Sequence, residues 1–195
     1  MAIETVCVYC ASSAQAPPLY GEAAARLGRH LATEGLALVY GGSTLGSMAR
    51  LAQAALDAGG QVTGVIPRFM SDLEWAHPAL TKLHVVDDMH ERKRLMLELS
   101  DAVVALPGGC GTLEELFEAI TWKRLGLFVG PIVLVNVNRF FDPCLELLSR
   151  CVEEKFMDAR HRAMWSAVAD PEDVAAALHA APEWSAAARA FAALR

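Results

Sequence analysis

The stretch AVVALPGGCGTLEELFEAITWKR, residues 102–124, decides the fold of this chain. Its first five residues form a short apolar run, which is typical of a strand covered on both faces. The PGGCG that follows cannot continue a strand, because proline lacks an N–H donor and glycine permits backbone angles that other residues resist. From Thr112 onward, apolar side chains recur at spacings of three, four and seven. The stretch therefore predicts a buried strand, a glycine turn and a helix.

The glycine turn also predicts a binding site. A turn that leads into a helix presents bare N–H groups and the positive end of the helix dipole, which together favour a phosphate. We therefore expect residues 107–112 to bind a phosphorylated ligand.

The rest of the chain repeats this alternation of strand and helix. Further strands are predicted at residues 5–10, 36–40, 62–66, 83–86, 131–135 and 164–168, the last at an edge of the sheet. Helical patterns lie between them, and an alanine-rich tail, about residues 183–195, is expected to be helical as well. Such alternation implies an α/β fold, a parallel sheet of about six or seven strands with helices on both faces. At 195 residues, we expect one domain spanning residues 1–195.

Composition limits the possible partners. The net charge of −6 argues against nucleic-acid and anionic-membrane binding, and no apolar run reaches the length of a membrane span. The first residues lack the layout of a signal peptide, and five cysteines then favour a reducing, cytoplasmic setting. Cys7 and Cys10 lie three apart on a predicted strand, so they point to opposite faces and are expected to be core thiols. The six histidines show no metal-ligand spacing, so no metal and no cofactor is predicted.

Ligands of parallel sheets bind at the carboxyl ends of the strands, where the glycine turns of this chain lie. Ser12 follows the first strand, and Gly41 and Gly42 follow the second. Gly41 and Gly46 have P-loop spacing, but Ser47 stands where the phosphate-binding lysine is required, so an ATPase is rejected. The irregular residues 67–82 form a candidate lid.

Two cations fall on the apolar side of a predicted helix. Asp88 and Glu91 form a capping box that begins this helix, and Arg92 and Lys93 share the stripe that carries Met89. Cations near the positive end of a helix dipole are unfavourable unless an anion compensates. Either a ligand supplies that anion, or the two heads reach water or a structural carboxylate.

Glu115 has two interpretations. It lies three residues after Thr112, so it can complete a capping box at the helix start. It also lies with Trp122 on the side opposite Leu113, where a ligand cleft or a partner subunit can meet the helix. Spacing alone leaves cap and catalyst equally open.

The motifs together resemble the LOG (Lonely Guy) family of cytokinin-activating phosphoribohydrolases. Residues 107–115, PGGCGTLEE, match the family motif Pro-Gly-Gly-x-Gly-Thr-x-x-Glu, and residues 89–93, MHERK, match the Arg-Lys element before it. Residues 40–43, YGGS, resemble the family's glycine turn after the second strand. The similarity covers roughly residues 5–165. Ser43 and Ala49 stand where the family usually has glycine, which puts the shape of the ligand edge in question.

The resemblance implies a Rossmann-like fold and hydrolysis of N6-modified adenosine 5′-monophosphates or AMP to free base and ribose 5-phosphate. Carried over by position, Arg92 and Glu115 are the catalytic pair. The implied substrate-binding residues are Ser12, Gly41, Gly42, Glu74, Met89, Lys93, Pro107, Gly108, Gly109, Cys110, Gly111, Thr112, Leu113, Glu114 and Thr121. The resemblance also implies a homodimer, which the Trp122 face and the following Lys123 and Arg124 favour.

Other functions stay open beside this one. A broad purine and pyrimidine nucleotide nucleosidase would use the same pair of residues. A non-catalytic nucleotide or molybdenum-cofactor carrier has similar glycine turns, but the presence of both Arg92 and Glu115 favours the enzyme. The label "lysine decarboxylase" that some family members carry is discounted, because nothing in the sequence indicates a pyridoxal-phosphate lysine with its partners.

Overall fold

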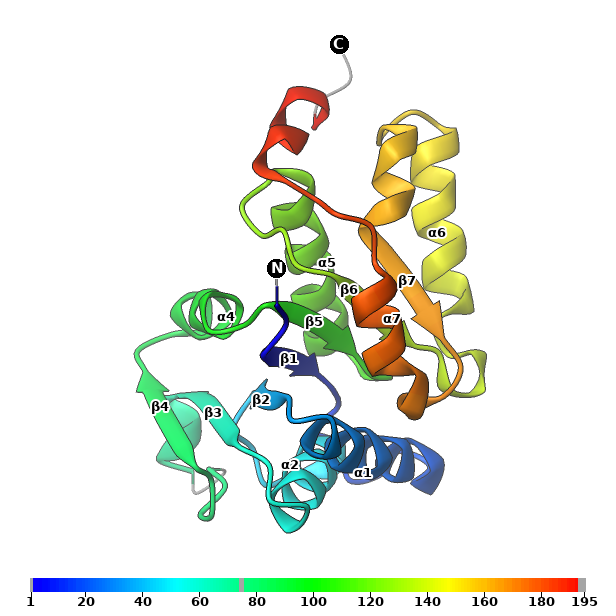
Figure 1. The fold of residues 1–195 in the computed structure, drawn as a ribbon. Helices are drawn as coiled ribbons and strands as arrows, with labels where there is room; N and C mark the ends of the chain where they lie inside the picture. Colours follow the sequence, from blue (N-terminus) through cyan, green and yellow to red (C-terminus); the bar gives the residue numbers. More distant parts are fainter. Residues whose placement is uncertain (1, 74–75, 193–195) are drawn as a thin grey trace.

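A computed structural model of the chain describes residues 2–73 and 76–192 (Figure 1). Its seven strands are β1 (Thr5–Tyr9), β2 (Ala37–Tyr40), β3 (Val62–Pro67), β4 (Lys82–Val86), β5 (Ala102–Ala105), β6 (Ile132–Val135) and β7 (Trp165–Val168). All pair in parallel in one sheet of order β4-β3-β2-β1-β5-β6-β7. The predicted α/β fold and the predicted edge strand are confirmed.

Helices cover both faces of the sheet (Figure 1). On one face lie α1 (Pro18–Thr33), α2 (Gly46–Asp57) and α7 (Val174–Ala180), and on the other lie α4 (Met89–Glu98), α5 (Cys110–Arg124) and α6 (Asp142–Glu153). One further α-helical turn, α3 (Arg68–Ser71), follows β3 directly. Short 3-10 segments complete the described chain: η1 (Val137–Arg139), η2 (Ala159–Met164), η3 (Pro171–Asp173) and η4 (Ala186–Phe191).

Successive residues of the central strand β1 point into two separate cores. Val6 and Val8 pack with α1 and α2, whereas Cys7 and Tyr9 pack with α4 and α5. Cys10 belongs to the first core, so Cys7 and Cys10 are buried on opposite faces as predicted. This alternation follows from the two-residue period of a strand and leaves no polar face on the central sheet.

The start of α5 differs from the prediction. The helix begins at Cys110, with Gly109 as its N-cap and no capping side chain. The predicted Thr112–Glu115 capping box is therefore wrong, because Thr112 already lies within the first turn. Asp88 caps α4 as predicted, because its carboxylate accepts from the N–H groups of His90 and Glu91 at 2.7 and 2.8 Å. The predicted capping box is not completed, since the Glu91 carboxylate accepts from the N–H of Asp87 at 2.9 Å instead of that of Asp88.

The tail is less helical than expected. Residues 182–185 have no regular secondary structure and only η4 follows, while residues 193–195 lie outside the described part. Side chains fix this tail to the end of α5: the Trp184 indole donates to the Lys123 carbonyl at 2.8 Å, and Arg124 donates to the Ala192 carbonyl. Lys123 is only 1% exposed and donates to the Gly130 carbonyl at 2.7 Å. Lys123 and Arg124 are thus engaged within the chain and give no support to a partner surface.

Candidate active site

A cavity of about 350 Å³ lies at the carboxyl ends of the central strands. The sheet order reverses its direction between β1 and β5, and the turns after these two strands lead to opposite faces, which opens a crevice at this point. Sixteen described residues line it: Cys10, Ala11, Ser12, Ser13, Gly41, Ser43, Met48, Ile66, Met70, Met89, Arg92, Gly109, Cys110, Gly111, Thr112 and Glu115.

An ion pair between α4 and α5 lines this cavity. Arg92 Nη1 lies 3.0 Å from Glu115 Oε1, and the two residues are 5% and 6% exposed. The Arg92 guanidinium also donates to the Val65 carbonyl through Nε at 3.1 Å and to the Gly41 carbonyl through Nη2 at 3.4 Å. Three elements therefore fix its orientation, which is what a planar group with several donors allows.

Gly41 is required for this arrangement. A Cβ atom at this position would lie 2.0 Å from Arg92 Nη2, closer than any real contact. Gly41 thus makes room for the guanidinium, while the left-handed backbone of the same turn belongs to Gly42.

Burial is the largest influence on the pKa of the Glu115 carboxyl. Removal from water raises the pKa of the Glu115 carboxyl above its usual range, although the Arg92 charge opposes this shift. Glu114 and Glu118 also raise this pKa, and Lys93 lowers it. A carboxylate with a raised pKa beside a fixed guanidinium, inside a cavity, is typical of an acid–base or charge-stabilising group.

The N-terminus of α5 forms another wall of the cavity. Gly109, Cys110, Gly111 and Thr112 lie there, and the first N–H groups of a helix have no partner within it. Thr112 packs so closely under the turn that a Cβ on Gly108 would lie 2.1 Å from Thr112 Oγ1. This wall can bind an anion.

The structure brings together nine of the sequence-predicted site residues. Ser12, Gly41, Met89, Arg92, Gly109, Cys110, Gly111, Thr112 and Glu115 line the cavity. Gly42, Lys93, Pro107, Gly108, Leu113, Glu114 and Thr121 are not among its lining residues. Glu74 lies outside the described residues.

Sequence reasoning missed the apolar part of the cavity. Met48, Ile66 and Met70 line it. The polar Ser13 and Ser43 line the cavity as well, and the sequence places Ser43 at the ligand edge without naming it as a contact. Ser13, Ser43 and Ile66 lie at or just beyond strand ends, so their position in a parallel sheet was the available signal. The predicted lid region is held by backbone contacts, since Ser43 pairs with Ala76 and the His77 N–H donates to the Gly42 carbonyl at 2.9 Å.

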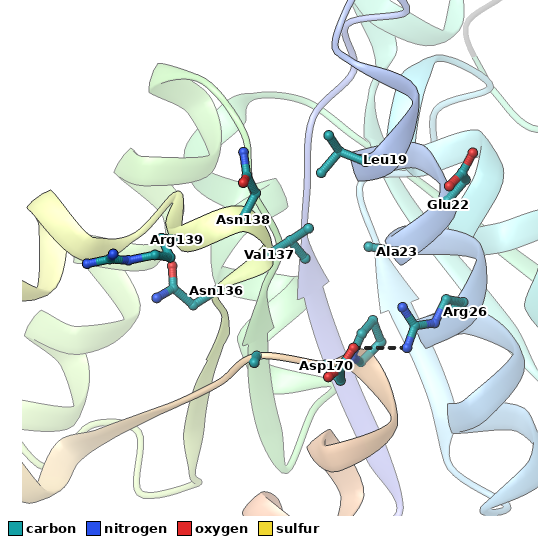
Figure 2. Close-up of a pocket in the computed structure, with 11 residues that line it drawn as sticks. Leu19, Glu22, Ala23, Arg26, Asn136, Val137, Asn138, Arg139 and Asp170 are labelled. Carbon is teal, nitrogen blue, oxygen red and sulfur yellow. Dashed lines mark hydrogen bonds and ion pairs between the residues drawn. The ribbon is translucent and has the colours of Figure 1, made fainter.

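A second cavity, of about 410 Å³, lies beside α1 and the turn after β6 (Figure 2). Its two arginines already have carboxylate partners. Arg26 extends from α1 to Asp170 at 3.1 Å and also pairs with Glu172, and Arg139 lies 2.6 Å from Asp142 (Figure 2 shows the first pair). None of the sequence-predicted site residues lines this cavity.

Within the described ranges, no three side chains of the His, Cys, Asp or Glu type come together as a metal-binding group. None of the helices described combines the length and apolar character needed to cross a membrane.

A doubly wound parallel sheet with a cavity at its switch point defines the class of α/β proteins that bind a ligand at the carboxyl edge of the sheet. Comparison with solved structures agrees on the fold: the molybdenum cofactor carrier protein of Chlamydomonas reinhardtii superposes with a TM-score of 0.71 at 24% identity, covering 91% of this chain and 97% of that chain.

Sequence comparison is more specific. The model of the family described as "Possible lysine decarboxylase" matches residues 48–178. A cytokinin riboside 5′-monophosphate phosphoribohydrolase of Rhodococcoides fascians is 46% identical over 176 residues, which are 90% of this chain and 89% of that protein. A protein of the same name from Arabidopsis thaliana is 42% identical over 80% of this chain and 74% of its own length. The chain belongs to this family, the LOG family.

Proposed function

We propose that this protein hydrolyses the N-glycosidic bond of adenosine 5′-monophosphates, including those with an N6 substituent, to free base and ribose 5-phosphate. The names of its relatives support this substrate class. The observation that carries the proposal is the buried pair of Arg92 and Glu115 in a cavity walled by the N-terminus of α5.

Glu115 acts on the sugar. Cleavage of an N-glycosidic bond builds positive charge on the ring, and a carboxylate near the anomeric carbon stabilises this charge more in the transition state than in the ground state. Glu115 serves as that stabiliser or as the base for the attacking water. Arg92 holds it in place, because its guanidinium is itself fixed by the backbone of β3 and of the turn after β2.

The nucleotide is held at its two ends. The 5′-phosphate binds the N–H groups of residues 110–112 at the start of α5, far from the bond that breaks. The base lies against the apolar wall that contains Met48, Ile66 and Met70. A cavity of about 350 Å³ is within the range of small-molecule sites.

We place the active protein in a homodimer in the cytoplasm. Trp122, a half-buried apolar side chain on α5, offers a contact to a second copy. All five cysteines are free, which agrees with a reducing compartment.

The direct test is chromatographic detection of adenine released from AMP, with adenosine as the comparison. Phosphate binding predicts that adenosine is a poorer substrate by about 100-fold or more in kcat/KM, since it lacks the remote binding group. Equal turnover of AMP and adenosine would contradict the phosphate site.

Two alternatives are decided in the same assay. Parallel reactions with AMP, GMP, CMP and isopentenyladenosine monophosphate separate the proposed preference from a broad nucleotide nucleosidase. A carrier would bind nucleotide in a fixed ratio and release no base. The likeness to the molybdenum cofactor carrier concerns the fold, since the two chains are 24% identical.

A further inference from the structure

Lys93 lies next to Arg92 in the sequence but pairs on another side of α5. Its side chain is only 6% exposed, and its Nζ lies 3.2 Å from Glu118 Oε1 and also pairs with Glu114. It is not among the described residues that line the cavity. Of these two consecutive cations of α4, Arg92 therefore pairs with a carboxylate that lines the cavity, and Lys93 pairs with two carboxylates that do not.

The two outer carboxylates affect Glu115. Glu114, Glu115 and Glu118 lie within two turns of α5, and like charges three or four residues apart repel one another. Glu114 and Glu118 raise the pKa of Glu115, while Lys93 lowers it. Without Lys93, the charge of Arg92 alone would oppose burial and two negative neighbours.

The remaining neighbours of Glu115 stay neutral. Cys7 and Tyr9 of β1, and Cys10 directly after it, lie within its electrostatic reach, and burial raises the pKa of each of them. Burial alone would lower the pKa of Lys93, but its hydrogen bonds to Glu114 and Glu118 outweigh this and raise the pKa, so its charge persists. The charged groups that act on Glu115 are therefore those of α4 and α5.

We propose that Lys93 is a positioning residue, which neutralises Glu114 and Glu118 and so keeps Glu115 a carboxylate paired with Arg92, without itself contacting the nucleotide. This inference rests on the proposed function for its kinetic consequences. It departs from the role that the family resemblance implies for Lys93, a place in the phosphate and ribose site. The reason is geometric: an Nζ turned toward the cavity would leave Glu114 and Glu118 without their buried partner.

The proposal is tested by removing the charge of Lys93 alone and then together with the charges of Glu114 and Glu118. Lys93→Met should lower kcat for AMP hydrolysis by about tenfold or more near neutral pH, with KM changed less than about threefold. The acid limb of its kcat–pH profile should move to higher pH. The triple variant Lys93→Met, Glu114→Gln, Glu118→Gln removes the two carboxylates as well, and should recover kcat to within about threefold of wild type. Lys93→Arg should also be active, since it restores a cation.

The matched control is Arg94→Met. Arg94 is the next cation on α4, and it forms an exposed pair with Glu98 at 3.8 Å, so its loss should change neither kcat nor the pH profile. If Lys93 contacts the phosphate instead, Lys93→Met will raise KM for AMP and the triple variant will keep that defect. This outcome would overturn the proposal, and it remains measurable in the triple variant if Lys93→Met alone does not fold.

A second readout does not depend on activity. The Glu115 carboxyl carbon can be followed by ¹³C NMR during a pH titration of each variant. Its midpoint should rise in Lys93→Met and fall back in the triple variant, and an unchanged midpoint in both would overturn the proposal. Should the wild type release no base from AMP, the proposed function fails, while the titration still decides the role of Lys93.

Discussion

At the scale of single residues, the protein keeps two opposite charges out of water at one point. Burying a carboxylate and a guanidinium together is costly unless both are hydrogen-bonded, and Arg92 meets this condition through two backbone carbonyls as well as Glu115. The neutral state of Glu115 is favoured by its burial more than by any other cause. Function therefore depends on keeping the proton off this carboxyl.

Glu115→Gln should lower kcat for AMP by about 10³-fold or more, because the amide cannot stabilise the developing positive charge. AMP binding, measured by calorimetry, should persist. In the wild type, kcat should fall as the pH drops through the raised pKa of Glu115, since the carboxylate is the active form. A variant that hydrolyses AMP at the wild-type rate would remove Glu115 from the chemistry.

At the scale of elements, close backbone approaches set the positions of the helices. The helices α1 and α2 meet at Gly28, where a Cβ atom would lie 2.1 Å from the Leu51 carbonyl oxygen. On the opposite face, α4 and α5 are joined by the pairs of Arg92 and Lys93 with carboxylates of α5. The contact between α1 and α2 thus depends on the absence of a side chain at Gly28, whereas the contact between α4 and α5 includes ion pairs.

Gly28→Ala should destabilise the protein by about 1–3 kcal/mol, because the added methyl group must push two backbones apart. Urea unfolding gives the free energy, and Gly21→Ala on the same helix is the control. A Cβ on Gly21 meets only the Arg50 side chain, at 3.7 Å. That variant should gain about 0.5–1 kcal/mol from its helix propensity, and equal effects of the two changes would contradict the packing argument.

At the scale of the whole molecule, the order of the strands assembles the site. The cavity takes residues from the turns after β1 and β2, from the end of β3 and from both α4 and α5, which lie up to about a hundred positions apart in the sequence. We expect the proposed second copy to contact the side of α5 that carries Trp122.

Light scattering at micromolar concentration should therefore give twice the mass of one chain. Trp122→Ser is a suitable variant, since Trp122 is half-buried on α5 and lies outside the cavity lining. It should shift the equilibrium toward monomer. A wild-type protein that stays monomeric under these conditions would remove the dimer from the proposal.

Much of this could be predicted from the sequence. The apolar runs at residues 102–106 and 131–135 give strands, because a strand of a doubly covered sheet has no polar face. Asp88 predicts the start of α4, because its carboxylate satisfies N–H groups that the helix leaves free. The start of α5 could not be fixed in this way, because glycine and threonine in PGGCGT both permit a helix start, and in the structure Gly109 is the cap.

The sequence by itself determined the kind of structure: strands and helices in alternation, glycine turns at the carboxyl edge, and acids and bases near those turns. These depend on the local period and on backbone chemistry, which act over a few residues. Only the tertiary structure decided which charges meet. Arg92 and Lys93 look alike on a helical stripe, yet the packing of α4 and α5 in one core brings the first to Glu115 inside the cavity and the second to Glu114 and Glu118 outside it. The physical reason is that a Coulomb interaction depends on distance in space, which a sequence spacing of more than twenty residues does not fix.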